Sequence, residues 1–309
     1  MKNLLKLFNP TFNHYKMKNK KSLIKNLIFA LTFLGTIFFS QNKVNAEESP
    51  VCPDPSSTTI SSISDSGDAT SFTAVTGGGF CRGTPDEYGV TVYKMGFCTK
   101  NPGNPTGSSV LAGAAPDYST CTWGYENSDG EAASFAAGGS IDLSEAYASE
   151  PAKGTYPYAV MIISKDFLIK GKFGPVGGKT YYSTTTFESS SNDIADYATT
   201  EAPLNSFGGP GNCTAYTEDE TVAGGTISAY LLNSAGTMLV NDSSLSKCSG
   251  QVKLLGVMNM SSDLTIADTT KGLKMTFVVT NNGMSVVTNS SATDIYMDSG
   301  PFSVTFDTF

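Results

Sequence analysis

Histidine is the residue whose distribution says most about the chemistry open to this chain. Among the 309 residues there is one histidine, His14. It lies in an N-terminal segment that we expect to be removed, which would leave no imidazole for a Ser-His-Asp site, a Cys-His site or zinc binding. The sequence therefore predicts a protein that is not an enzyme of these classes, and it carries no other catalytic motif.

Paired carboxylates are the remaining groups that could catalyse a reaction, because glycoside hydrolysis needs two acids at a fixed separation. The closely spaced acid pairs are Asp129 and Glu131, Asp142 and Glu145, and Glu218 and Glu220. Their spacing does not separate them from solvated loop charges. An extracellular carboxylate-dependent glycan hydrolase is thus an alternative function.

Acidic and amide side chains gather in one short segment, at Glu126, Asn127, Asp129 and Glu131. Hard oxygen ligands on a flexible loop suit Ca²⁺. The spacing does not match an EF-hand loop, and an Asx-rich β-turn is the simpler interpretation. Calcium is the one cofactor that the sequence suggests, and a calcium-dependent carbohydrate-binding module is a second alternative function.

Aromatic stacking on a sugar would use Trp123, the only tryptophan, together with Tyr125. A tryptophan beside a disulfide is also common in the cores of β-sandwiches, so core packing is the competing interpretation. Lys94 stands out because the segment around it is apolar. We expect its side chain to point outward with a packed stem, the alternative being a buried lysine paired with, or covalently joined to, a carboxylate.

Cysteines are even in number and indicate disulfide bonds in an oxidising compartment. Closure of short loops favours three pairs: Cys52 with Cys81, Cys98 with Cys121, and Cys213 with Cys248. Close Cys-x-x-Cys spacing is absent from the sequence, which argues against a zinc site.

The N-terminal segment predicts export through a signal peptide at residues 1–46. A lysine-rich stretch without acids precedes the apolar run Leu27–Phe39, and Val44-Asn45-Ala46 resembles a cleavage site. As a helix the apolar run would reach only about 20 Å, so we expect no integral membrane span after cleavage, and an uncleaved anchor is the alternative. The periplasm, the cell surface and the medium are all open as destinations.

Charge argues against a nucleic-acid partner. Cleavage after Ala46 would leave 12 basic and 28 acidic residues, a formal charge of −16. A field of that sign repels phosphate backbones.

Strand-forming patterns dominate the rest of the chain and predict an all-β fold, a disulfide-stapled antiparallel β-sandwich in one large domain or two small ones. The expected divisions are an N-terminal extension rich in Ser, Thr and Pro at 47–79, a first sandwich part at 80–188, a linker or loop at 189–212 and a second part at 213–309.

Two hairpins are expected in the second part. One joins 226–232 to 237–240, and the other joins 273–279 to 284–287 through Asn281-Asn282-Gly283, which favours a primed two-residue turn.

The segment Ile141–Ile163 resembles the Pro-x-Gly-x-Tyr pattern of prealbumin-like sandwich domains in bacterial surface proteins. Here the turn is Lys153-Gly154-Thr155-Tyr156, and the proline is displaced to Pro151. The resemblance implies a non-catalytic sandwich and assigns no functional residue. We therefore expect a secreted or cell-surface protein with an adhesion, binding or envelope structural role, whose partner lies outside the cell or in the envelope, a glycan being one candidate.

Overall fold

The computed structural model describes residues 51–57, 80–135, 148–208, 212–222, 224–270, 273–288 and 294–308. The predicted signal peptide and most of the predicted 47–79 extension lie outside these ranges. Within them the only helical elements are three short 3-10 turns, η1 (Pro55–Ser57), η2 (Tyr118–Thr120) and η4 (Ile194–Asp196), and the remaining elements are antiparallel strands. The all-β prediction is confirmed.

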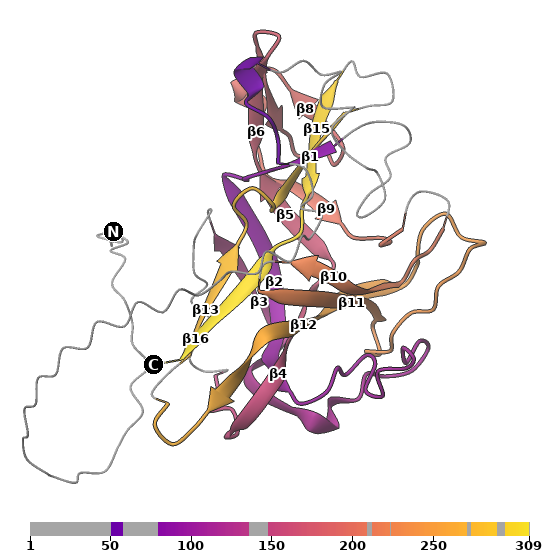
Figure 1. The fold of residues 1–309 in the computed structure, drawn as a ribbon. Helices are drawn as coiled ribbons and strands as arrows, with labels where there is room; N and C mark the ends of the chain where they lie inside the picture. The colour runs from indigo at the N-terminus through magenta and orange to yellow at the C-terminus, as the bar shows by residue number, and fades with distance from the viewer. Residues whose placement is uncertain are drawn as a thin grey trace, which may run out of the picture.

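A large antiparallel sheet runs through the middle of the molecule (Figure 1). Its strand order is β10-β11-β12-β4-β2-β5-β9, and β3 also pairs with β2. The strands are β2 (Glu87–Cys98), β3 (Cys121–Phe135), β4 (Gly154–Ser164), β5 (Asp166–Lys170), β9 (Thr200–Pro203), β10 (Tyr216–Val222), β11 (Gly225–Asn233) and β12 (Gln251–Ile266).

Strands from both sides of the predicted 189–212 boundary share this sheet. β4 pairs with β12, placing Ile162 opposite Leu255. The boundary segment itself contributes β9 to the central sheet, and its short strand β8 (Ser190–Ser191) belongs to a smaller sheet. The central sheet therefore joins the first and second predicted parts through backbone hydrogen bonds.

Smaller sheets complete the fold. They are β1-β14-β15, from β1 (Phe80–Gly83), β14 (Met284–Thr288) and β15 (Ile295–Ser299); β6-β7-β8, from β6 (Lys172–Val176), β7 (Lys179–Ser183) and β8; and β13-β16, from β13 (Leu273–Val278) and β16 (Ser303–Thr308). Strands β1, β6, β8 and β15 gather at one end of the molecule (Figure 1).

The main core lies between the small sheets and one face of the central sheet. Tyr88 and Ile169 of the central sheet share it with Phe277 of β13 and with Val286 and Ile295 of the small sheet, all five side chains being fully buried. Removal of this much apolar surface from water is the main driving force for folding.

A second core covers the opposite face of the central sheet. Met161 and Ile163 of β4 face the main core, whereas the alternate residues Val160 and Ile162 face the second core. This alternation follows from the two-residue period of a strand. The long connection 99–120 lies over this second core, where Tyr118 packs against it.

All three predicted disulfide bonds are confirmed: Cys52–Cys81, Cys98–Cys121 and Cys213–Cys248. The first ties the segment near Val51, which pairs with Arg82, to β1. Three disulfide bonds indicate an oxidising compartment outside the cytoplasm.

The predicted hairpin after β11 is confirmed, since Leu232 pairs with Met238 across its turn. The predicted hairpin at Asn281-Asn282-Gly283 is wrong. The chain does turn there, with Asn281 at φ 55° and the amide of Gly283 donating to Val279 O at 2.8 Å. However, β13 pairs with β16, and β14 pairs with β1 and β15. Every residue of β14 is buried. A position between two partner strands stabilises such a strand more than the edge of a hairpin does, because it buries both faces and pairs both edges.

Candidate functional site

Trp123 lies on β3, and a β-bulge determines which way its side chain points. Met95 of β2 pairs with Tyr125, but the next residue, Gly96, pairs with Trp123, so Gly124 is an extra residue on β3. A bulge of this kind interrupts the alternation of side chains along a strand. Trp123 therefore contacts the second core, and Tyr125 belongs to the main core on the opposite face.

Trp123 and Tyr125 therefore do not share a surface, as the predicted ligand platform would require. Tyr125 is 2% exposed, and its hydroxyl donates a hydrogen bond to Glu131 Oε2 at 2.8 Å. Strict alternation would have placed the two rings side by side, and the bulge at Gly124 separates them. Trp123 is partly buried.

Close packing fixes the indole ring of Trp123. The ring lies against Gly96 of β2, where a Cβ atom added to the glycine would be 2.9 Å from Cε3 of the indole. Tyr118 of η2 packs edge-to-face on the ring, with 5.3 Å between the ring centroids. The connection closed by Cys98–Cys121 thus supplies one wall for Trp123, and glycine at position 96 leaves the space beneath it.

Lys94 lies beside Trp123 on the same face. Its Nζ atom is 5.1 Å from the centroid of the indole ring and 2.5 Å from Glu126 Oε1. The two charged side chains are 40% and 46% exposed, so this ion pair lies at the surface. The expectation that Lys94 points outward with a packed stem agrees with this geometry.

A second lysine on this face also lies over an aromatic ring. Tyr93 is an extra residue on β2, because Val92 pairs with Ile163 of β4 and Lys94 pairs with the adjacent Ile162. The bulge places Tyr93 on the same side of the sheet as Lys94, where Tyr93 packs against the second core. Lys253 Nζ from β12 lies 3.8 Å from the centroid of the Tyr93 ring.

We call Tyr93, Lys94, Trp123 and Lys253 the aromatic–lysine patch. Its residues come from β2, β3 and β12, and two bulges bring them together. All four residues are partly buried, and the side chain of Lys94 is 40% exposed. Tyr93 and Lys253 were not predicted from the sequence, because neither bulge is visible in the period-two pattern.

The residues predicted to bind calcium are engaged elsewhere. Glu126 pairs with Lys94, Glu131 accepts from Tyr125, and Asn127 Oδ1 accepts from the amide of Asp129 at 3.1 Å in an Asx-turn. Gly130 follows with φ 78°. Across the described ranges, no group of three or more His, Cys, Asp or Glu side chains is arranged to hold a metal ion.

Of the acid pairs that could catalyse glycan hydrolysis, Glu218 and Glu220 lie on β10. Glu218 accepts a hydrogen bond from Asn104 Nδ2 at 3.0 Å, which fastens the 99–120 connection to β10. Glu220 accepts from Thr217 Oγ1 at 2.9 Å. Asp142 and Glu145 lie outside the described residues. Glu218 thus fastens a loop, and Glu220 bonds to a neighbour on its own strand.

A buried polar cluster lies at the other end of the molecule and was missed from the sequence. Arg82 of β1 is 1% exposed and bonds through Nη1 to Ser285 Oγ, and Asp298 of β15 is 6% exposed. Burial raises the pKa of Asp298 to about 6, while the nearby charge of Arg82 opposes that rise. Tyr88 donates to Gly300 O at 3.1 Å, and burial raises its pKa well above the usual value.

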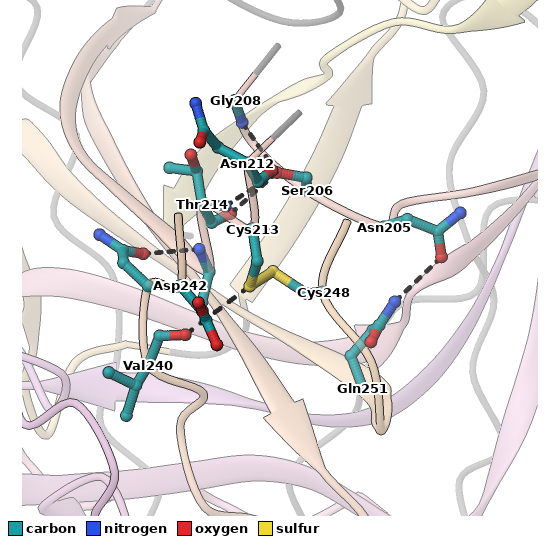
Figure 2. The surroundings of a disulfide bond; sticks show 12 residues. Asn205, Ser206, Gly208, Asn212, Cys213, Thr214, Val240, Asp242, Cys248 and Gln251 are labelled. Atoms are coloured by element: carbon teal, nitrogen blue, oxygen red, sulfur yellow. Dashed lines mark hydrogen bonds between the residues drawn. A yellow bond between two sulfur atoms is a disulfide. The ribbon is translucent and has the colours of Figure 1, made fainter. Parts of the chain in front are cut away.

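Figure 2 shows how the Cys213–Cys248 disulfide fixes the connection between β11 and β12. Cys213 and Asp242 exchange two backbone hydrogen bonds, of 3.0 and 2.9 Å. Beside them, Gln251 Nε2 donates to Asn205 Oδ1 at 2.9 Å. This long polar connection is therefore held at both ends.

Comparison with known proteins gives no family for this chain. No family model, no curated protein and no solved structure matches it. In the part of the chain that the structure describes, no helix is long and apolar enough to cross a membrane.

Proposed function

We propose that this chain is an exported, disulfide-stabilised β-protein of the cell surface or extracellular space that binds a glycan without cleaving it. The aromatic–lysine patch is the observation that supports the proposal. It joins two aromatic rings, two ammonium groups and the carboxylate of Glu126 on one face of the sheet, at the edge of the second core. Rings, donors and acceptors together are what sugar recognition needs.

Rigidity of the patch adds support. Its side chains project from paired strands, and Trp123 is packed on Gly96 and Tyr118. A preorganised surface loses less conformational entropy when a ligand binds than a flexible loop does.

The test is binding of the exported full chain to an array of neutral and acidic glycans, with release of reducing ends measured in the same samples. We expect binding without release, and weaker binding after Tyr93→Ala or Trp123→Ala. Ile194→Ala is the control, because Ile194 is 69% exposed and lies outside the patch. Melting curves and circular dichroism confirm that each variant is folded.

Two results would count against the proposal. Release of new reducing ends would indicate the carboxylate-dependent hydrolase instead. Failure to bind any glycan would leave an envelope structural role.

A further inference from the structure

We propose that the aromatic–lysine patch recognises a polysaccharide that carries uronic-acid carboxylates. This inference rests on the proposed glycan-binding function and narrows its ligand to one chemical class. The two ammonium groups of the patch would meet the carboxylates, and Glu126 would accept hydrogen bonds from sugar hydroxyls.

The aromatic rings prepare the lysines to bind anions. Lys253 Nζ lies 3.8 Å from the centroid of Tyr93, and Lys94 Nζ lies 5.1 Å from that of Trp123. Each ring attracts the cation over its face and restricts a side chain that would otherwise be mobile. A carboxylate can then approach from the open side, so that the ammonium group lies between the ring and the anion.

Lys253 contributes a charge that this chain does not neutralise locally. Its ammonium group forms no ion pair with any residue in the described ranges. Lys94 is paired with Glu126, but an ammonium group has three N–H donors and that pair leaves others for a ligand. The patch therefore has a net positive charge at the point of contact.

The acidic charge of the whole chain does not prevent this contact. Screening at physiological ionic strength reduces interactions between exposed charges beyond about 8 Å, so the nearest groups dominate. Glu126 favours a ligand that bears hydroxyl groups beside its anionic groups, since a carboxylate accepts hydrogen bonds from O–H donors. Sugars that carry both carboxylates and hydroxyl groups offer partners for the ammonium groups and for Glu126.

The two lysines come from different strands of the central sheet. Lys94 lies on β2 and Lys253 on β12, with β4 between them. Two strand spacings correspond to about 10 Å between the two backbones, and the Lys253 side chain extends from β12 over the Tyr93 ring of β2. A uronate polymer repeats its carboxylates and offers an anion to each ammonium group.

Polygalacturonate and uncharged dextran are the probes for the test, with affinities measured for the oxidised full chain. We expect polygalacturonate to bind and dextran to bind at least about tenfold more weakly. Lys94→Gln and Lys253→Gln should each weaken polygalacturonate binding about two- to fivefold, as expected for one partly exposed charge contact. Lys94→Arg and Lys253→Arg should retain binding, because they keep the charge.

The matched control is Lys153→Gln. Lys153 pairs with Asp268 at the surface, is 59% exposed and contacts no ring of the patch, so its removal should leave binding unchanged. Added salt should weaken binding of the unmodified chain and reduce the difference between the chain and its Lys→Gln variants.

Several outcomes would overturn the inference. Equal affinity for dextran and polygalacturonate, or Lys→Gln variants that bind polygalacturonate like the unmodified chain, would remove the uronate assignment. If uncharged glycans bound and Trp123→Ala abolished that binding, the proposed function would stand while this inference failed. If no glycan bound at all, both would fail.

Discussion

Arg82 and Asp298 lie in one row of the β1-β14-β15 sheet, one on each side of Ser285. Both side chains are buried, and the row brings an arginine and an aspartate into an interior where charges are costly. This relationship predicts how the stability of the protein depends on pH.

The first prediction concerns Asp298→Asn. Burial raises the pKa of Asp298 from its usual 3.8 to about 6, so the folded state binds this proton more tightly than the unfolded state. The free energy of unfolding should therefore fall as pH rises from about 4 to about 6, by about 3 kcal/mol. Asp298→Asn should remove that decline, which urea unfolding from pH 4 to pH 8 would measure. An unchanged pH profile in the variant would contradict it.

The second prediction concerns Arg82→Met. The charge of Arg82 lowers the pKa of Asp298 against the larger effect of burial. Without that charge, the pKa of Asp298 should rise further, so the decline in the free energy of unfolding should extend above pH 6 and its midpoint should move upward. The same unfolding series checks this, and the double variant with Asp298→Asn should show no midpoint. A midpoint at lower pH would show that Arg82 acts on the cluster in some other way.

The third prediction is that Gly96→Ala disturbs the patch. An added Cβ atom would lie 2.2 Å from the backbone oxygen of Thr122 and 2.9 Å from the indole of Trp123. We expect a loss of about 1–3 kcal/mol in the free energy of unfolding, as for other overpacked sites, together with a shift in tryptophan fluorescence. Gly256→Ala is the control in the same sheet, because its nearest neighbour would be 4.0 Å away. Equal effects at both positions would contradict the prediction.

The fourth prediction concerns the Cys98–Cys121 disulfide, which closes the 99–120 connection. Replacing both cysteines with alanine should lower the free energy of unfolding by about 3 kcal/mol, the range expected for a loop of this length. Hydrogen exchange should accelerate first in the connection around Asn101 and Asn104, which its polar contacts hold to Tyr230 and Glu218. Uniform acceleration throughout the central sheet would argue against a local role.

The fifth prediction concerns calcium. Glu126 and Glu131 are engaged by Lys94 and Tyr125, which leaves few free ligands in the predicted segment. The melting temperature should therefore be the same with added calcium and with a chelator. A rise of several degrees with calcium would restore the calcium-dependent module as the better interpretation.

Local features of the sequence predicted much of this structure. The three disulfide bonds followed from short loop closure, and the hairpin after β11 followed from its turn residues. These features depend on residues close together in the chain, for which sequence patterns are informative.

Long-range pairing was not predictable in the same way. The turn at Asn281 does reverse the chain, but burial on both faces of β14 sends this strand to β1 and β15. Likewise, the bulges at Tyr93 and Gly124 depend on the strands beside them, and they decide which rings share a face. The patch therefore required tertiary structure, and only Trp123 and Lys94 stood out beforehand.

The pairing of β4 with β12 has a consequence for biogenesis. Because β12 is made long after β4, the middle of the central sheet stays incomplete until the ribosome has produced nearly the whole polypeptide. Topologies with such distant contacts fold slowly. A chain that folds slowly stays unfolded for longer after synthesis, which would suit the export that we propose and would leave its cysteines accessible to an oxidant before the sheet closes.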